Sequence, residues 1–331
     1  MSFHSMVKHE RMGYGDVKIY GGTASHDLAE KVTEYLKIQI CEHDVIPFPN
    51  ENLLVKLKTS VRGQDCYIIQ TTSSPVHRNL MELLITIQTL KLDSASRVTA
   101  VIPYLSYAKS DKKDQPRIPI TARLIADMIE VAGADRYIIF DLHAGQIQGF
   151  FSIPGDVVST FYMLVKHIQQ FKDQMLSPVV VSADLGFAKK ARNFAEKMDT
   201  PLAFIEKRRV ANDSKAKALT LIGNVKGRDV ILVDDEVDTG GSMVEAVKTV
   251  KNAGAREVYM VFVHAVLSGD AASKIAALPV KQFVTTDTIP IPAEKRDAFE
   301  GRLTVLSIAP LLSEVILRTN EGRSVGEMFS E

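Results

Sequence analysis

The segment from Gly227 to Val250, GRDVILVDDEVDTGGSMVEAVKTV, joins an apolar run to two carboxylates and a glycine-containing turn. The run Val230 to Val233 has the continuous apolar character of a central parallel strand, and apolar residues recur at helical spacing beyond the turn. We therefore expect a strand over 230–233, a loop at its carboxyl end and then a helix. Such a loop can direct backbone N–H groups at a phosphate, reinforced by the positive end of the helix.

The polar groups of this loop include both hydrogen-bond donors and hydrogen-bond acceptors. The backbone N–H groups of residues 239–242 can donate to a phosphate, and the glycines let the phosphate come close. Asp234 and Asp235 cannot hold a phosphate, but they can accept hydrogen bonds from the vicinal hydroxyls of a ribose. The combination predicts a site for ribose 5-phosphate or a derivative. A plain strand-to-helix turn with acidic N-caps would explain one Asp and one Gly, but not three acids followed by Thr-Gly-Gly-Ser.

A second group of polar residues follows other apolar runs. Asp141 and His143 come just after RYIIF, and Asp184 ends PVVVSAD. Their oxygen and nitrogen atoms are suitable ligands for a hard divalent cation, most simply Mg²⁺ bridging nucleotide phosphates. A single histidine at a strand end is more often a core or capping residue, so the spacing alone leaves both interpretations open.

Two basic segments have the composition of nucleotide-binding loops. The cluster EKRR at 206–209 could close over a nucleotide and neutralise charge during phosphoryl transfer, or it could be a solvated strand end. The segment PYLSYAKSDKKD, which contains Lys109 and Asp114, could hold nucleotide phosphates or form a solvated turn. Walker A and GxGxxG sequences are absent from the chain, so a bound ATP would lie outside the common phosphate cradles.

Length and composition describe a globular enzyme that handles small molecules. The 331 residues are enough for two domains, and 46% of them are apolar. Forty basic residues balance forty acidic ones, so no net field favours nucleic acid or a membrane surface. Cys41 and Cys66 form no disulfide framework, which suits a reducing compartment. Without an apolar leader or a run approaching roughly 20 apolar residues, we expect a cytoplasmic protein.

One unit of an apolar strand, a polar loop and an amphipathic helix recurs along the chain. A first series runs from VKIYGGTASHDLAEKV to RYIIFDLHAGQIQGFF, and a second begins at PVVVSADLGFAKKARNF after a break around 153–160. Strands that alternate with helices predict an α/β fold with two mainly parallel sheets, each flanked by helices. The loops that could do chemistry all begin at the carboxyl ends of strands, where such sheets bind ligands.

These segments, in this order, closely resemble the ribose-phosphate pyrophosphokinase family, also called phosphoribosyl pyrophosphate (PRPP) synthetases. The resemblance extends from about Val17 to Phe329. It includes NLMELL, IPITARLIADM, VAGADRYIIFDLHAGQIQGFF, EKRR, LVDDEVDTGGS, HAVLSG, TDTIP and APLLSEVI. Several separate motifs in register make the resemblance specific.

The resemblance implies a fold and an activity. It implies two tandem domains of the type I phosphoribosyltransferase fold, over residues 16–158 and 159–311, with residues 312–331 packing back on the first domain. The histidines and scattered charges of residues 1–15 predict a flexible extension. It implies an Mg²⁺-dependent enzyme of nucleotide biosynthesis that moves the β,γ-diphosphoryl group of ATP onto the anomeric hydroxyl of ribose 5-phosphate, giving PRPP and AMP. Such enzymes form homo-oligomers, commonly hexamers built from dimers.

Site residues follow from the resemblance motif by motif. Ribose 5-phosphate would be bound by Asp234, Asp235, Asp238, Thr239, Gly240, Gly241 and Ser242. Lys207 and Arg209 would stabilise the transferring group, and His143 and Asp184 would hold Mg²⁺. The nucleotide would be bound by Phe48, Asn50, Asn52, Lys109, Ser110, Asp114 and His143.

Departures from the family pattern gather in the nucleotide site. The adenine loop ends in Asn52 where the family has Glu, and Lys109 and Ser110 stand where the family has Arg-Gln, so a bidentate guanidinium is lost. Three alternatives therefore stay open beside the synthetase: a diphosphokinase with another nucleotide or sugar-phosphate acceptor, a weakly active regulatory homologue, and a phosphoribosyltransferase. The two series of strands and the EKRR segment disfavour the phosphoribosyltransferase.

Overall fold

The computed structural model describes residues 14–184, 186–209 and 217–329. The chain divides into two compact units. Unit 1 comprises Met1–Val157 together with Ala309–Glu331, and unit 2 comprises Val158–Ile308. Unit 2 is therefore an insertion, in sequence, between the body of unit 1 and its last helix.

Unit 1 is built on a five-stranded sheet in the order β1-β4-β5-β6-β7. The registers of β1 with β4, β4 with β5 and β5 with β6 are all parallel. The strands are β1 (Val17–Gly21), β4 (Asp65–Ile69), β5 (Arg97–Ile102), β6 (Arg136–Phe140) and β7 (Gly155–Val158). Parallel pairing places the carboxyl ends of β4, β5 and β6, and the polar loops that follow them, at one edge of the sheet.

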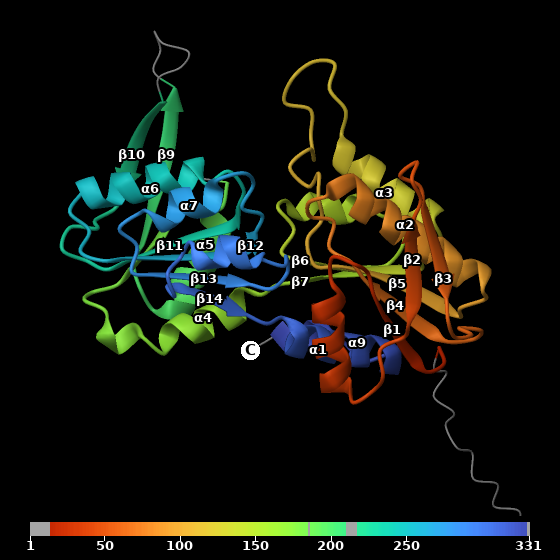
Figure 1. The fold of residues 1–331 in the computed structure, drawn as a ribbon. Coiled ribbons are helices and arrows are strands. Elements are labelled where there is room, and N and C mark those ends of the chain that lie inside the picture. Colours follow the sequence, from red (N-terminus) through yellow and green to blue (C-terminus); the bar gives the residue numbers. More distant parts are fainter. Residues whose placement is uncertain (1–13, 185, 210–216, 330–331) are drawn as a thin grey trace, which may run out of the picture. The chain divides into compact units, whose positions relative to one another are not determined.

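Helices cover both faces of this sheet, because successive side chains of a strand point to opposite faces. Cys66 and Ile68 of β4 belong to the core under α2 (Val76–Leu92) and α3 (Thr121–Val131). Tyr67 between them points the other way, and its hydroxyl donates to the carbonyl of Ile316 at 3.5 Å. On that side α1 (His26–Leu36) lies beside α9 (Ala309–Glu321), the helix contributed by the end of the chain (Figure 1).

The link between α9 and the sheet is a buried ion pair. Arg97 of β5 donates to both carboxylate oxygens of Asp65 on β4, at 2.8 and 2.6 Å, and the two side chains are 7% and 0% exposed. The same guanidinium donates to the carbonyl of Thr319 at 3.2 Å, and Asn320 donates to Asp65 at 2.9 Å. The pair therefore joins two strands and the terminal helix in one hydrogen-bonded network.

A separate hairpin in unit 1 was not among the strands expected from the sequence. It consists of β2 (His43–Pro47) and β3 (Leu53–Leu57), which pair antiparallel as a two-stranded sheet. The turn at its tip is closed by the N–H of Phe48, which donates to the carbonyl of Asn52 at 2.8 Å. The adenine-loop residues are thus carried on the tip of this hairpin.

Unit 2 is built on a seven-stranded sheet in the order β10-β9-β8-β11-β12-β13-β14. All its pairings are parallel except the edge pairing of β10 with β9. The strands are β8 (Val179–Ser182), β9 (Leu202–Arg209), β10 (Lys217–Ile222), β11 (Val230–Val237), β12 (Val258–Ala265), β13 (Gln282–Thr286) and β14 (Leu303–Leu306). The helices are α4 (Phe161–Gln169), α5 (Ala188–Met198), α6 (Gly241–Asn252), α7 (Ala271–Ala276) and α8 (Ala293–Asp297).

Alternation of the buried strand residues gives unit 2 two cores. Val230 and Leu232 of β11 pack with residues of α6 and α7 on one face. Ile231 and Val233 pack with residues of α4 and α5 on the other. A strand covered on both faces has to be apolar throughout, which explains the unbroken run at 230–233.

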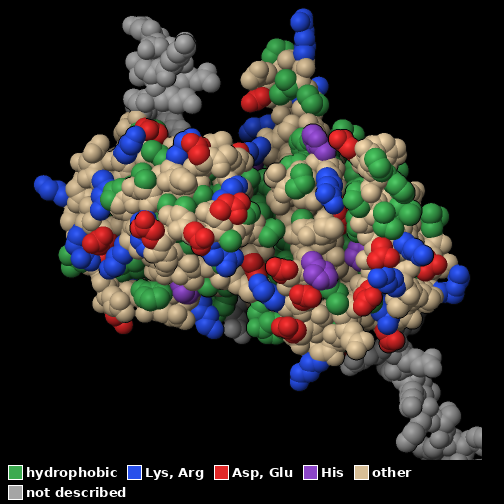
Figure 2. All heavy atoms as spheres, in the orientation of Figure 1, with side chains coloured by type: hydrophobic (Ala, Val, Ile, Leu, Met, Phe, Trp, Pro, Cys, Tyr) green, Lys and Arg blue, Asp and Glu red, His purple; other side chains and the backbone are tan. Residues whose placement is uncertain are grey.

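The predicted fold class, α/β with mainly parallel sheets flanked by helices, is confirmed in both units. On the face of the molecule in Figure 2, Lys and Arg side chains are interspersed with Asp and Glu, as the balanced composition predicts. Within the part of the chain that the structure describes, no helix is long and apolar enough to cross a membrane.

Replacing Arg97 by Met should destabilise unit 1, because it leaves the Asp65 carboxylate buried without its cation. We expect a loss of about 3 kcal/mol in the free energy of unfolding. Urea denaturation followed by circular dichroism suits a chain without tryptophan. The matched control is Arg123→Met on α3, which breaks the exposed pair with Asp127 and should change the stability little. Equal losses in the two variants would contradict the structural role of the buried pair.

Candidate active site

Strand β11 continues four residues beyond the predicted end. The sequence predicted a strand over 230–233 that stops at the two carboxylates, whereas the strand extends to Val237. Asp234 pairs with Phe262 and Glu236 pairs with His264, because β12 is itself eight residues long and offers partners that far. That boundary was wrong, and the acids lie within the strand, before the loop.

The acids of β11 lie in a poorly hydrated position. Asp234 is 8% exposed and Asp235 is 6% exposed. The N–H of Asp235 donates to Asp234 Oδ1 at 2.9 Å, and the N–H of Glu236 donates to Asp235 Oδ1 at 3.0 Å. Burial raises the pKa of Asp234 well above its ordinary value, and the charges of Asp235 and Asp184 raise it further. This edge of the sheet therefore attracts groups that donate hydrogen bonds or carry positive charge.

Asp184 reaches this acidic edge from the neighbouring strand. It follows β8, which pairs with β11, and its Oδ1 accepts from the N–H of Phe187 at 2.9 Å. That bond fixes the carboxylate at the start of α5. Among the described residues no three His, Cys, Asp or Glu side chains form a ready-made metal cage. The carboxylates of Asp184 and Asp234 are nonetheless hard oxygen donors, the type of ligand that a magnesium ion shares with substrate phosphates.

The loop after β11 turns sharply at Gly240. This residue has φ 77°, in the left-handed region, and it precedes α6 directly. A Cβ at Gly240 would lie 2.9 Å from Cγ2 of Ile275 and 3.7 Å from Cβ of Ala271, both on α7. Glycine is therefore required here both by the backbone conformation and by the close approach of α7.

Two backbone hydrogen bonds hold the start of the loop. The N–H of Leu267 donates to the carbonyl of Val237 at 2.9 Å, and the N–H of Ser268 donates to the carbonyl of Asp238 at 3.0 Å. Lys295 of α8 in turn donates to the carbonyl of Leu267 at 2.7 Å. The loop is thus fastened from the segment after β12, with Gly241 and Ser242 forming the first turn of α6. The first N–H groups of a helix lack intrahelical acceptors and point outward, which suits an anion.

A cavity of about 570 Å³ opens at this loop. Its lining includes three of the predicted phosphate-binding residues and neighbours from three other elements. They are Thr239, Gly241 and Ser242 of the loop, Val244 and Glu245 of α6, Leu219 of β10 and Lys274 of α7. Leu219 and Lys274 had no local sequence signal that marked them, because their position depends on how the strands and helices pack.

The predicted nucleotide-binding residues all lie in unit 1. Phe48, Asn50 and Asn52 occupy the tip of the β2–β3 hairpin, where Phe48 is 45% exposed and the Asn50 side chain accepts from the N–H of Asn52 at 3.3 Å. Lys109, Ser110 and Asp114 lie in the loop between β5 and α3. Ser110 also fastens that helix, because its hydroxyl accepts from the N–H of Thr121 at 3.2 Å.

Hydrogen bonds connect the polar loops at the carboxyl edge of the unit 1 sheet. Thr72, after β4, donates to the carbonyl of Tyr104, after β5, at 3.0 Å. Gln146, after β6, donates to Asp111 in the β5 loop. His143 lies exposed in the turn after β6, whereas Asp141 is 4% exposed. Both residues were predicted as possible metal ligands, but the His143 side chain is exposed to solvent whereas the Asp141 side chain is buried.

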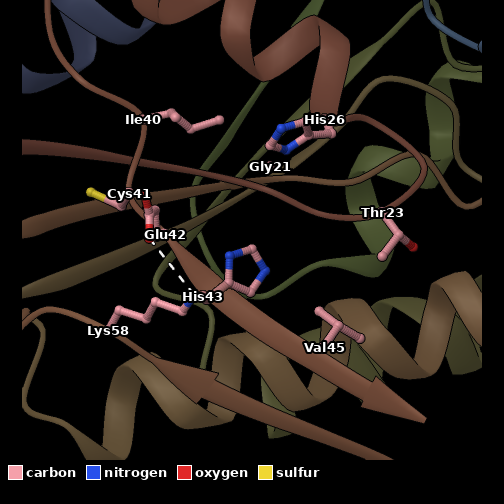
Figure 3. Close-up of a pocket in the computed structure, with 9 residues that line it drawn as sticks. All are labelled: Gly21, Thr23, His26, Ile40, Cys41, Glu42, His43, Val45 and Lys58. Atoms are coloured by element: carbon pink, nitrogen blue, oxygen red, sulfur yellow. Dashed lines mark ion pairs between the residues drawn. The ribbon is translucent and has the colours of Figure 1, made fainter.

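A smaller cavity, of about 420 Å³, lies at the base of the hairpin (Figure 3). His26 of α1 and His43 of β2 line it, and Lys58 forms an ion pair with Glu42 at its rim, at 3.7 Å. Burial lowers the pKa of His43, so its neutral form is favoured. This cavity separates the hairpin from the loop after β1.

The remaining predicted residues are placed only in part. His143 belongs to unit 1 and Asp184 to unit 2, so the proposed metal pair is divided between the units. The backbones of Lys207 and Arg209 end strand β9, and their side chains lie outside the described residues.

Comparison with known proteins agrees with this fold. The sequence profile of the N-terminal domain of ribose phosphate pyrophosphokinase matches residues 17–133, and that of the phosphoribosyl synthetase-associated domain matches residues 210–330. The ribose-phosphate pyrophosphokinase of Caldanaerobacter subterraneus is 44% identical over 95% of this chain and 98% of its own. That of Clostridium acetobutylicum is 41% identical over 98% of this chain and 100% of its own.

A solved structure has the same fold over nearly the whole length. The crystal structure of phosphoribosylpyrophosphate synthetase from Mycobacterium smegmatis has a TM-score of 0.87 and 38% identity, covering 93% of this chain and 99% of that chain. Fold and site therefore define an α/β enzyme that handles phosphoribosyl compounds. The chain belongs to the ribose-phosphate pyrophosphokinase family, and the resemblance found in the sequence is confirmed.

Replacing Gly240 by Ala should distort the loop and weaken ribose 5-phosphate binding by roughly 10- to 100-fold, because the new Cβ meets α7 and the left-handed backbone becomes strained. Isothermal titration calorimetry measures the affinity. The matched control is Gly227→Ala, with φ 70° and no neighbouring atom within 4 Å of its Cβ. It carries the same backbone strain away from the loop and should leave the affinity unchanged. Equal losses of affinity in the two variants would contradict a role of this loop in binding ribose 5-phosphate.

Proposed function

We propose that the chain is a ribose-phosphate diphosphokinase, which transfers the β,γ-diphosphoryl group of ATP to the anomeric hydroxyl of ribose 5-phosphate and releases PRPP and AMP. The main support for the proposal is that strand β11 and the loop after it offer two different kinds of binding group. Buried carboxylates at 234 and 235 precede a glycine turn and a helix start at 240–242. One kind suits the hydroxyls of ribose, and the other suits its phosphate.

Holding both ends of the sugar phosphate would fix the orientation of its reactive hydroxyl. Asp234 and Asp235 would accept hydrogen bonds from the vicinal hydroxyls, while the loop and α6 bind the 5-phosphate. Phosphoryl transfer needs positioning and charge neutralisation more than covalent assistance by the protein. The buried site supports this role, because few water molecules compete there for the sugar hydroxyls.

Magnesium is the metal that the acidic edge fits best. Asp184 and Asp234 offer carboxylate oxygens. Burial and, after it, the charges of Asp235 and Asp184 raise the pKa of Asp234, and a divalent cation would favour its charged form. Bound there with nucleotide phosphates, Mg²⁺ would neutralise the charge of the transferring group. The role of His143 as a metal ligand stays a prediction from the family pattern.

The remaining roles follow the family pattern. Phe48, Asn50 and Asn52 would bind the base, Lys109, Ser110 and Asp114 would bind the nucleotide phosphates, and Lys207 and Arg209 would stabilise the transferring group. Asn52 presents an amide where the family has a carboxylate, so the base could be read with another donor and acceptor pattern. A homo-oligomer built from dimers, the hexamer in particular, and a cytoplasmic location stay predictions.

The full-length protein, incubated with ribose 5-phosphate, Mg²⁺ and each of ATP, GTP, CTP and UTP in turn, should form PRPP and AMP in equal amounts with ATP. Chromatography of sugar and nucleotide products measures both. Turnover with another nucleotide alone would show that Asn52 and Lys109 have changed the donor. Absence of turnover with all four would contradict the proposed function and favour a different acceptor or a regulatory homologue.

Replacing Asp235 by Asn should weaken ribose 5-phosphate binding about tenfold, because a charged acceptor for the sugar hydroxyls becomes a neutral amide. ATP affinity should change less than about twofold, since the nucleotide residues lie on other loops. Calorimetric titration with each substrate separates the effects. Glu257→Gln serves as the control, because Glu257 precedes β12 at the opposite end of the sheet. If Asp235→Asn weakens the binding of ribose 5-phosphate and of ATP equally, the proposed role of Asp235 in binding the ribose is refuted.

A further inference from the structure

We propose that Lys274 of α7 binds the phosphate group of the sugar phosphate. The inference rests on the proposed function and adds a residue that lies outside the loop 234–242. Its basis is the position of α7 against the turn, the lining of the cavity and the charges of the lining side chains.

Helix α7 lies directly against the glycine turn. The atoms nearest to a Cβ at Gly240 would be Cγ2 of Ile275, at 2.9 Å, and the carbonyl oxygen of Ala271, at 3.6 Å. Ala271 and Ile275 are four residues apart on one face of α7, and both are fully buried. Lys274 lies on the same short helix, and its side chain lines the cavity at this loop.

Lys274 and the predicted phosphate-binding residues line the same cavity. Thr239, Gly241 and Ser242 contribute the loop side, and Lys274 contributes the α7 side. Among the lining residues, all of them within the described part of the chain, Lys274 is the one cation and Glu245 the one anion. Without Lys274, a phosphate at the loop would meet N–H groups and the hydroxyls of Thr239 and Ser242, but no positively charged side chain among these lining residues. The ammonium group of Lys274, on the α7 side of the cavity, would favour binding of the doubly charged phosphate.

The present partner of Lys274 does not prevent this role. Its Nζ lies 2.7 Å from Oδ1 of Asp270, one turn earlier, and the two side chains are 52% and 70% exposed. Exposed pairs of this kind contribute little to stability, so a phosphate with two negative charges can compete for the ammonium. Lysine is a flexible point charge with three donors, and it can turn toward the cavity without movement of the helix.

Four variants of the full-length protein test the proposal. Lys274→Met removes the charge and keeps the length of the side chain, and Lys274→Arg restores a cation. Asp270→Asn removes the partner and leaves the lysine in place. Lys281→Met removes a lysine from the start of β13, at the opposite edge of the same sheet. Calorimetry gives the dissociation constant for ribose 5-phosphate, and steady-state kinetics give KM for each substrate.

Lys274→Met should raise the dissociation constant and KM for ribose 5-phosphate about tenfold, with KM for ATP changed less than about twofold. Lys274→Arg should recover most of the affinity. Asp270→Asn and Lys281→Met should bind as the wild type does, or more tightly for Asp270→Asn. Unchanged binding in Lys274→Met would overturn the proposal. So would a loss in Asp270→Asn equal to that in Lys274→Met, because the ion pair would then act only by supporting α7.

The proposed function can fail separately. If the wild type binds ribose 5-phosphate but forms no PRPP from ATP, the diphosphokinase activity is refuted, and the binding comparison among the variants still decides the role of Lys274. If the wild type does not bind ribose 5-phosphate, both proposals are refuted together.

Discussion

The burial of Asp234 beside two other carboxylates is the constraint on which the rest of the site depends. A carboxylate that is 8% exposed and close to Asp235 and Asp184 is unfavourable in its charged form, so its pKa is raised. The surrounding sheet tolerates this only because β11 is held between β8 and β12 by parallel ladders. The favourable packing of the two cores therefore offsets the unfavourable burial of the Asp234 carboxylate. A ligand that donates hydrogen bonds to the carboxylate, or brings a cation, stabilises its charged form.

The loop depends on the same strands through a different interaction. Leu267 and Ser268 fasten its first carbonyls, α7 lies against Gly240, and α6 starts immediately after it. The backbone path of the turn is fixed by two strands and two helices. A preorganised backbone of this kind binds an anion with little loss of conformational entropy, which is the advantage of building a phosphate site from main-chain groups.

Much of the fold could be predicted because its signals are local. Unbroken apolar runs such as 230–233 and helical spacing at 243–250 indicated the strands and helices of both parallel sheets. The β2–β3 hairpin was missed because its residues are mostly half-buried or exposed, so the run is short and weakly patterned. The true end of β11 was missed because the partner strand, rather than its own sequence, extends it. Lys274 was missed for a similar reason, since only the packing of α7 brings it to the loop.

The position of α9 has a consequence for how the protein is made. Asp65 and Arg97 precede unit 2 in the sequence, whereas Thr319 and Asn320, which complete their network, follow it. Every segment of unit 2 is synthesised between them. Domains generally fold as units during synthesis, N-terminal first. Here the first unit cannot be completed before unit 2 has been synthesised, because α9, which lies beside α1 on one face of the unit 1 sheet, follows unit 2 in the sequence.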